Sequence, residues 1–332
     1  MNKVTDDHHR AATGLTADLV EEARSVTDGR LLRTPVVPSP ALSEVFGVRV
    51  HLKLECLQVT GSFKARGALF AMHRLRAQGV REVSACSAGN HGKGIAWAAS
   101  ELGMKAVVFV PRSVDASKLE AMRSLGASVE LSEFVGYDDT EAWALEEAER
   151  RGLPWVSAYD DPAVMAANGG TVALEVLEQA PEARTFVMPV GGGGHAAGFT
   201  FMAGLRLADT RFVMCQHRES PGFQLSVDRG EPVTELPAIE TLASGLEGGF
   251  GTRTFEILRD RYDEIRLVSE EEIRNAMRWM ARRHGLIIEG SSAAAVAACL
   301  QNPPIETVGD VVVFISGRNI AMNTALDVLG GG

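Results

Sequence analysis

Strand-like apolar runs alternate with amphipathic helical segments from residue 83 to residue 159, and this alternation restricts the chain to an α/β architecture. The expected strands are residues 83–86, 106–110, 129–131 and 155–158, and the expected helices are residues 95–102, 113–125 and 139–151. Each of these helices is followed by a glycine, the residue at which helices commonly end. Strands joined through helices of this length form right-handed βαβ units, so the pattern predicts a parallel sheet.

A second α/β set follows in the carboxyl-terminal half. We expect helices at residues 162–179, 196–207, 270–284 and 292–300, and strands at residues 185–190, 211–216 and 310–315. Residues 219–251 carry no clear pattern of either kind. At roughly 150 residues per domain, a chain of 332 residues predicts two domains.

Charge and cysteine usage argue against several functional classes. The formal net charge is −10, which disfavours nucleic acid and anionic membranes as partners. The chain has four cysteines that are far apart, so free, buried thiols are favoured over disulfides or a metal site. The amino terminus has no apolar targeting core, and no run is long enough to span a membrane. We therefore expect a soluble cytoplasmic protein.

One cluster of glycines indicates a phosphate site. Gly191, Gly192, Gly193 and Gly194 lie between a predicted strand and a predicted helix. Backbone N–H groups in such a turn can point at an anion, and the helix start adds a positive dipole end. The alternative is a dinucleotide site of the form G-x-G-x-x-A, which also requires an acid at the end of the next strand. No acid follows that strand before Glu219, so the dinucleotide interpretation is weakened but open.

Two further clusters point to an amine-binding cofactor and an amino-acid substrate. Residues 87–92 read Ser-Ala-Gly-Asn-His-Gly between a strand and a helix, which suits a carboxylate. Residues 60–68 read Thr-Gly-Ser-Phe-Lys-Ala-Arg-Gly-Ala. Lys64 stands just inside a helix start, where the dipole disfavours a positive charge and should lower the pKa of its amine. A nucleophilic lysine beside a phosphate cradle indicates a phosphorylated aldehyde cofactor.

These three clusters, together with Ser316-Gly317-Arg318-Asn319, resemble the serine/threonine dehydratase family in order and approximate spacing. This family belongs to the fold-type II, tryptophan-synthase-β-like pyridoxal phosphate enzymes. The resemblance runs from about Leu32 to the carboxyl terminus. It implies a two-domain α/β fold in which each domain is a largely parallel twisted sheet flanked by helices. Residues 1–77 plus 156–332 would form the large cofactor-binding domain, and residues 78–155 a small domain inserted in it.

The resemblance also implies roles for individual residues. Lys64 would bind pyridoxal 5′-phosphate covalently and act as the catalytic base, and Phe63 would pack beside the cofactor ring. The other implied cofactor-binding residues are Asn90 at the 3′-oxygen, Ser316 at the pyridine nitrogen, and Gly191, Gly192, Gly193 and Gly194 at the phosphate. The substrate carboxylate site would consist of Ser62, Ser87, Ala88, Asn90 and His91.

The implied activity is that of a lyase that removes water from a serine- or threonine-like hydroxy-amino acid and releases a 2-oxo acid and ammonia. A neutral hydroxyl at Ser316 leaves the cofactor ring a milder electron sink, which favours β-elimination. A racemase, a β-replacement synthase, an NAD-dependent oxidoreductase and a non-catalytic sensor remain alternatives. The resemblance also implies a homodimer. The substrate side chain would meet residues 135–137 and 242–249, which carry no readable code.

Three positions depart from the family pattern. No counterpart of the racemases' second acid/base is visible near Ala88, so elimination is favoured over racemisation. Gln216-His217 stands where metal-binding relatives have Glu-Pro, and because a neutral amide is a poor ligand for hard cations, a bound cation is left undecided. Arg318 replaces a glycine; it is interpreted first as an outward surface residue and second as a cation for an acidic substrate.

Overall fold

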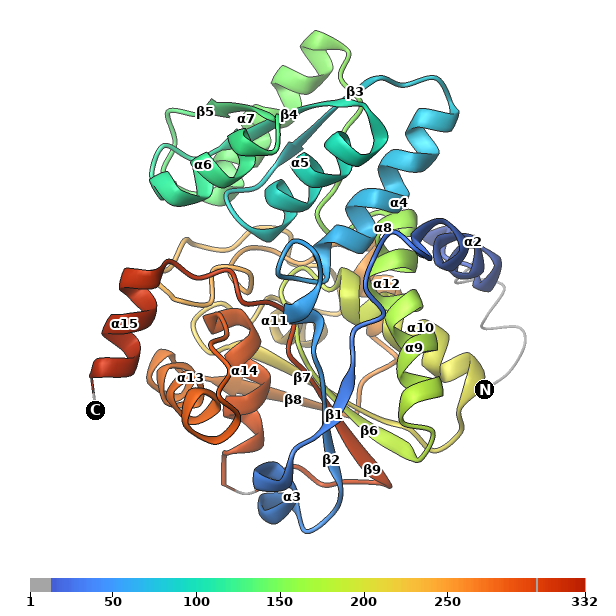
Figure 1. Cartoon of the computed structure of the whole chain (residues 1–332), viewed down its shortest axis with the longest axis vertical. Coiled ribbons are helices and arrows are strands. Elements are labelled where there is room, and N and C mark those ends of the chain that lie inside the picture. Colours follow the sequence, from blue (N-terminus) through green and yellow to red (C-terminus); the bar gives the residue numbers. More distant parts are fainter. Residues whose placement is uncertain (1–12, 303, 332) are drawn as a thin grey trace.

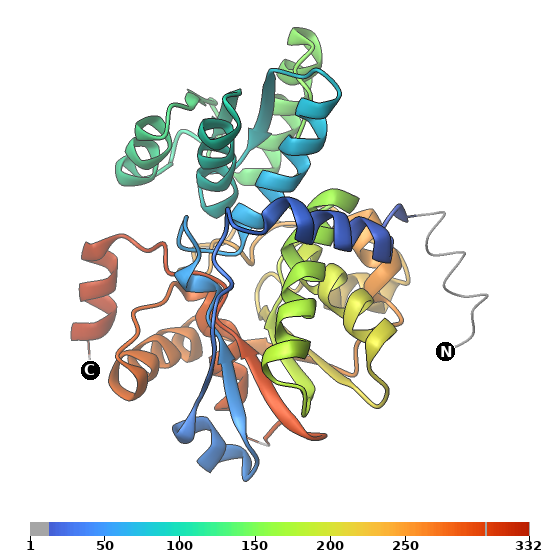
Figure 2. The same ribbon diagram turned by 45° about the vertical axis from the view of Figure 1, so that its right-hand side comes forward.

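Two β-sheets organise the part of the chain that the computed structural model describes, residues 13–302 and 304–331. Figures 1 and 2 show the smaller sheet with its helices standing beyond one end of the larger one. The prediction that the chain has no targeting segment rests largely on residues 1–12. These residues lie outside the described part. Within the described residues, no helix combines the length and the apolar character needed to cross a membrane.

The larger sheet has six strands in the order β1-β2-β9-β6-β7-β8. Their bounds are β1 Val36–Pro38, β2 Val50–Lys53, β6 Ala183–Pro189, β7 Arg211–His217, β8 Glu264–Val268 and β9 Asp310–Phe314. Strand β1 pairs antiparallel with β2, and the other neighbours pair in parallel. In register, Val187 of β6 stands between Val213 of β7 and Val313 of β9. All three side chains are fully buried, as expected for a parallel sheet covered on both faces.

The smaller sheet has three parallel strands in the order β3-β4-β5. Strands β3 (Glu82–Cys86), β4 (Lys105–Val110) and β5 (Ser128–Leu131) are connected and covered by the helices α5 (Asn90–Leu102), α6 (Ala116–Ser124) and α7 (Tyr137–Arg151). Helix α7 has acidic residues in its first turn and arginines in its last, and it ends at Gly152 in the left-handed conformation. The charges therefore match the helix dipole at both ends.

The remaining helices pack around the larger sheet or, like α4 (Lys64–Ala77) against α5, between the two sheets' helices. They are α2 Ala17–Thr27, α3 Pro40–Phe46, η1 Glu55–Leu57, α4 Lys64–Ala77, α8 Pro162–Met165, η2 Ala166–Gly170, α9 Thr171–Gln179, α10 Gly194–Arg206, α11 Gly222–Arg229, α12 Thr252–Leu258, α13 Glu270–His284, α14 Gly290–Cys299 and α15 Met322–Gly330. Successive side chains of β6 enter two cores, because side chains alternate along a strand. Phe186 and Met188 pack with α9 and α10, whereas Val187 packs with α13 and α14.

The predicted alternation of strands and helices is confirmed, and so is the α/β fold class. Residues 155–158 were expected to form a strand, but only Trp155 makes an isolated bridge, to Ser84. The backbone leaves the sheet there, and the Ala158 carbonyl accepts a hydrogen bond from a lysine amine instead. The helix expected at residues 162–179 contains the π-helical turn η2, in which Gly169 approaches the backbone of α10 too closely for a Cβ. The four cysteines are free and buried.

Candidate active site

The predicted motifs meet where strands of both sheets end. Residues 191–194 follow β6, Ser316 follows β9, and residues 87–90 follow β3. Ser62 forms an antiparallel bridge with Gly317, which brings the start of α4 beside the chain that follows β9. Ligands of open parallel sheets bind at the carboxyl ends of the strands, so these four segments define the candidate site.

Lys64 is the first residue of α4, and its side chain is half-buried. Its Nζ donates a hydrogen bond of 2.7 Å to the Ala158 carbonyl oxygen and lies 5.3 Å from the centre of the Phe63 ring. Burial lowers the pKa of the Lys64 amine to about 8, although the negative charge of Glu289 acts in the opposite direction. A substantial fraction of this amine is therefore neutral near physiological pH, as a nucleophile or a base requires.

The four glycines after β6 form a loop in which each position is too crowded for a side chain. A Cβ on Gly191 would lie 2.3 Å from the Gly245 carbonyl oxygen, and a Cβ on Gly192 would lie 2.5 Å from the Tyr159 ring. Gly193 has a φ of 90°, and Gly194 begins α10. The loop therefore presents bare backbone at a helix start, which is the arrangement that binds phosphate groups.

The cluster after β3 contains residues with different surroundings. The hydroxyl of Ser87 accepts a hydrogen bond from the Gly89 N–H, and Ala88 lies half-buried in the turn between them. His91 is buried, and its Nε2 lies 3.0 Å from the Val156 carbonyl oxygen, so that nitrogen carries the hydrogen. Burial and the nearby charge of Lys64 lower the pKa of His91 to about 3, which makes the ring neutral.

Asn90 is held by two groups from the larger sheet. Its Nδ2 donates to Glu289 Oε1 at 2.7 Å, and its Oδ1 accepts from Asn319 Nδ2 at 2.7 Å. The backbone N–H of Asn319 donates to Glu289 Oε2 at 2.9 Å. Burial raises the pKa of Glu289 to about 7, while the hydrogen bonds from Asn90 and Asn319 counteract this rise. The network orients Asn90 toward the site from α5.

Two hydroxyl groups complete the floor of the site. Ser316 Oγ lies 2.9 Å from Ser292 Oγ, and Ser292 Oγ both accepts from the Gly317 N–H and donates to the Gly317 carbonyl oxygen. The single hydroxyl hydrogen of Ser292 is thus used, which leaves the hydrogen of Ser316 free to point at Ser292 or at a bound acceptor. The Oγ of Ser62 is buried and has no hydrogen-bond partner among the described residues.

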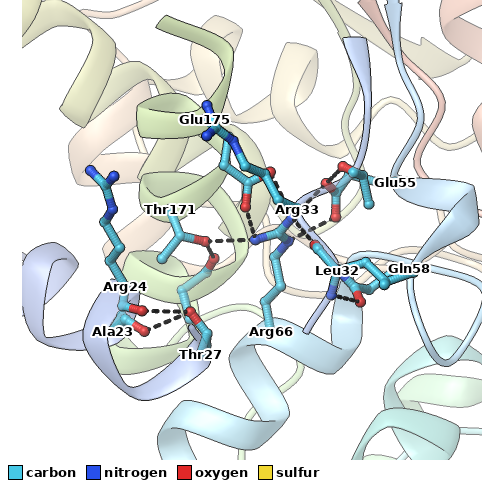
Figure 3. A network of polar contacts seen from close by, with 12 residues as sticks. Ala23, Arg24, Thr27, Leu32, Arg33, Glu55, Gln58, Arg66, Thr171 and Glu175 are labelled. Carbon is cyan, nitrogen blue, oxygen red and sulfur yellow. Dashed lines mark hydrogen bonds and ion pairs between the residues drawn. The ribbon is translucent and has the colours of Figure 1, made fainter. Parts of the chain in front are cut away.

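An ion cluster lies behind the start of α4 (Figure 3). Arg66 Nε is 2.9 Å from Glu55 Oε2, and Arg66 also bonds to Glu175 Oε1 at 2.7 Å. The Lys53 amine bonds to Glu175 Oε2 at 2.6 Å. Burial alone would raise the pKa of Glu55, but the charges of Arg66 and Lys53 hold it at about 2. The cluster connects α4, η1, β2 and α9, and so it fixes the helix that carries Lys64.

The segments expected to meet the substrate side chain are brought together. A Cβ on Gly248 would lie 3.5 Å from Asp138 Oδ1 and 3.8 Å from the Tyr137 ring. Asp138 Oδ2 also accepts a hydrogen bond from the Leu236 N–H. The start of α7 therefore faces the loop between α11 and α12.

Gln216, the position at which the sequence left a bound cation undecided, makes two hydrogen bonds within the protein. Its Nε2 donates to the Val190 carbonyl oxygen at 3.3 Å, and its Oε1 accepts from the Gln224 N–H at 3.0 Å. Across residues 13–302 and 304–331, no three His, Cys, Asp or Glu side chains are grouped to hold a metal ion.

Sequence reasoning missed the roles of Glu289, Ser292 and Tyr159. The sequence assigned no role to Glu289 or Ser292, although a glutamate directly before a helix of small residues is an available signal. Tyr159 covers Gly192 through a contact between distant segments, and nothing local to residue 159 indicates it.

Comparison with known proteins gives a consistent result. A family model described as pyridoxal-phosphate dependent enzyme matches residues 28–317. The chain is 36% identical to the L-threonine ammonia-lyase of Geobacter sulfurreducens over 308 residues, which is 92% of this chain and 76% of that protein. Among solved structures, a threonine deaminase from T.th. has a TM-score of 0.81 at 31% identity, covering 92% of this chain and 99% of that one. A pyridoxal 5′-phosphate-dependent aspartate racemase has a TM-score of 0.87 at 28% identity, covering 94% and 98%.

Proposed function

Because the chain belongs to the pyridoxal-phosphate dependent enzymes, and among them to the serine/threonine dehydratase type, we propose that its cleft converts a hydroxy-amino acid to a 2-oxo acid and ammonia. The enzyme is a carbon–oxygen lyase that uses pyridoxal 5′-phosphate. The observation that carries the proposal is the position of Lys64, a half-buried amine with a pKa lowered to about 8, among the motifs at the strand ends.

The residues present fit this cofactor. Its phosphate needs a cradle of bare backbone, and the crowded glycine loop at residues 191–194 provides one at a helix start. Its aldehyde needs a neutral amine, which Lys64 supplies. We propose that Gly191, Gly192, Gly193 and Gly194 hold the phosphate, that Phe63 packs beside the ring, and that Asn90 and Ser316 bind the ring oxygen and nitrogen.

The bound cofactor withdraws electrons from the Cα of the amino acid, which makes the Cα proton acidic and allows the β-hydroxyl to leave. Lys64 takes that proton at its Nζ, so it must be neutral at that moment. Ser62, Ser87, Ala88, Asn90 and His91 hold the substrate carboxylate. The unpartnered hydroxyl of Ser62 and the start of α5 support this assignment, because both offer hydrogens to an anion. His91 positions the α5 start through its bond to the Val156 carbonyl oxygen.

The organisation of the chain follows from the same proposal. We propose residues 78–155 as a small domain inserted into a large domain of residues 1–77 plus 156–332. The separate three-stranded sheet, whose strands all lie between residues 82 and 131, supports this division.

We also propose a homodimer in the cytoplasm. The exposed Met322 and Leu326 on α15 support an interface, and four free cysteines support a reducing compartment.

The test combines a spectrum with a product assay. The purified enzyme should show the visible absorbance of the lysine-bound cofactor, and Lys64→Ala should lose it. A panel of hydroxy-amino acids should yield 2-oxo acid and ammonia in equal amounts. A protein that binds the cofactor but only inverts an amino acid's configuration, or that gives no product with any member of the panel, would contradict the proposal.

A further inference from the structure

Helix α12 begins beside the glycine loop, and its amino-terminal cap comes from a distant segment of the chain. The residue before the helix is Gly251, which has no side chain that could cap it. Asp160, 94 positions before Thr254, accepts a hydrogen bond of 3.0 Å from the Thr254 N–H through its Oδ1. A Cβ on Gly251 would lie 2.6 Å from the same oxygen, so a larger residue there would displace the carboxylate. Asp160 therefore acts as the cap of α12, because it accepts from an N–H group that the helix itself leaves without an acceptor.

Thr254 connects this cap to the glycine loop. It is fully buried, and its Oγ1 lies 2.8 Å from the Gly192 carbonyl oxygen and 2.9 Å from the Gly251 carbonyl oxygen. Both oxygens are acceptors, so the single hydroxyl hydrogen lies between them. A Cβ on Gly193 would lie 3.0 Å from the Thr254 Cβ. Thr254 therefore packs directly against the loop and holds the oxygen of the peptide that joins Gly192 to Gly193.

The direction of this carbonyl determines where one N–H group of the loop points. The Gly192 carbonyl and the Gly193 N–H belong to one planar trans peptide, in which the two bonds point in opposite directions. With the oxygen bonded to Thr254, the Gly193 N–H points away from Thr254. Within residues 13–302 and 304–331, this N–H donates to no backbone oxygen. It is therefore available to an anion held by the loop.

The residues just before Asp160 contact other parts of the candidate site. The Ala158 carbonyl oxygen accepts from Lys64 Nζ at 2.7 Å, and the Tyr159 ring lies against the glycine loop. The Oγ of Ser157 accepts from the N–H groups of Tyr159 and Asp160 at 3.4 and 3.0 Å, which fixes the turn. One short turn therefore contacts both the amine and the loop.

We propose that Asp160 is a positioning residue for the cofactor phosphate, which acts through Thr254 by directing the Gly193 N–H toward the anion. The inference rests on the proposed function, because it assumes that the glycine loop holds the phosphate of pyridoxal 5′-phosphate. The Asp160 carboxylate fixes the start of α12, and Thr254 in turn fixes the peptide of the loop. Loss of the cap should therefore weaken binding of the phosphate group without changing the groups that contact the ring or the aldehyde.

The experiment compares two ligands, pyridoxal 5′-phosphate and pyridoxal, which lacks the phosphate. Equilibrium dialysis followed by absorbance measures each dissociation constant. We expect Asp160→Ala and Thr254→Val to weaken binding of pyridoxal 5′-phosphate about tenfold and to leave binding of pyridoxal unchanged. Asp160→Asn keeps an acceptor and Thr254→Ser keeps a hydroxyl, so both should bind like the wild type. In the holoenzyme, the phosphorus NMR signal of the cofactor should shift in the first two variants only.

Asp161→Ala is the matched control. Asp161 caps the neighbouring helix α8 in the same way, because its Oδ1 accepts from the N–H groups of Ala163 and Val164 at 2.8 and 3.0 Å. Both alanine variants lose a helix cap, so both should lower the melting temperature. Only Asp160→Ala should weaken binding of pyridoxal 5′-phosphate, because no contact of the Asp161 cap leads to Thr254.

Equal weakening of both ligands in Asp160→Ala, wild-type binding of both, or the same loss of pyridoxal 5′-phosphate binding in Asp161→Ala would overturn the proposal. These measurements need no turnover. A protein that shows the expected pattern of binding but produces no 2-oxo acid contradicts the proposed function alone. Conversely, an active lyase without this pattern overturns the role of Asp160 alone.

Discussion

The side-chain amide of Asn90 donates a hydrogen bond of 2.7 Å to the carboxylate of Glu289, although the two residues are 199 positions apart. Asn90 begins α5 beside the smaller sheet, and Glu289 precedes α14 beside the larger one. The bond therefore joins the two halves of the site directly. The negative charge of Glu289 also raises the pKa of Lys64. One carboxylate therefore influences both the position of α5 and the reactivity of the amine.

The first prediction concerns how the apoenzyme takes up its cofactor. Only the neutral form of an amine attacks an aldehyde, and burial lowers the pKa of Lys64 from 10.5 to about 8. The rate of covalent pyridoxal phosphate binding should therefore rise with pH and reach half its maximum near pH 8. Stopped-flow absorbance measures this rate. A midpoint near 10.5, the value of an exposed lysine, would show that the amine is not desolvated.

The second prediction changes the charge that opposes this shift. The carboxylate of Glu289 raises the pKa of Lys64, so Glu289→Gln should lower it further and move the midpoint of cofactor uptake to a lower pH. Glu147→Gln on the surface of α7 is the control, because Glu147 pairs with Arg150 away from the site. An identical midpoint in the wild type and Glu289→Gln would mean that the two groups do not interact.

The third prediction tests the glycine loop. An alanine at Gly192 places a Cβ against the Tyr159 ring, and the loop must move to accommodate it. Displacing a phosphate cradle in this way should weaken cofactor binding about 10- to 100-fold, as measured by absorbance after equilibrium dialysis. Gly204→Ala is the control, because Gly204 lies in α10 with open space around it. That variant should retain the cofactor and gain up to about 1 kcal/mol of stability.

The fourth prediction concerns the buried ion cluster. Arg66→Met removes the guanidinium between Glu55 and Glu175 and leaves buried carboxylate charge uncompensated. The free energy of unfolding should fall by about 3–5 kcal/mol, as measured by urea denaturation. Arg24→Met breaks an exposed pair with Glu178 and should cost no more than about 1 kcal/mol. Equal losses in the two variants would show that the buried cluster does not hold α4.

The fifth prediction concerns the hydroxyl under the Ser316 turn. Ser292→Ala leaves the buried Gly317 N–H without its acceptor, which should lower stability by about 1–3 kcal/mol. Thermal unfolding of the apoenzyme measures this loss independently of the cofactor. Ser100→Ala, at an exposed position of α5, should melt like the wild type. A wild-type melting temperature in Ser292→Ala would mean that another group satisfies Gly317.

The helices and strands were predicted well where the sequence signal is local. The acids and arginines of α7 and the glycines that end α5 and α7 act within one helical turn. The strands around them are short runs of buried apolar residues. Strand β8 escaped prediction because its side chains are mostly half-buried, and Glu264 and Arg266 pair on its surface.

The site was predictable only in part for a related reason. Lys64 and the glycines at residues 191–194 each lie in a continuous sequence motif, so the neighbouring residues in the sequence predict their roles. Glu289 acquires its role from Asn90 and Asn319, and Tyr159 acquires its role from Gly192, through contacts across the fold. The sequence around Tyr159 or Glu289 does not predict which distant residues these side chains contact in the fold.

Helix α4 has the Lys64 amine at its first residue, and its last residue, Ala77, adjoins the proposed boundary of the inserted domain at residue 78. Its 14 residues span about 21 Å, and it packs along α5 of the smaller sheet. Because a helix is stiff over this length, a movement at the Ala77 end of α4 also moves its first residue, Lys64. A displacement of the three-stranded sheet relative to the larger sheet would therefore also move the Lys64 amine.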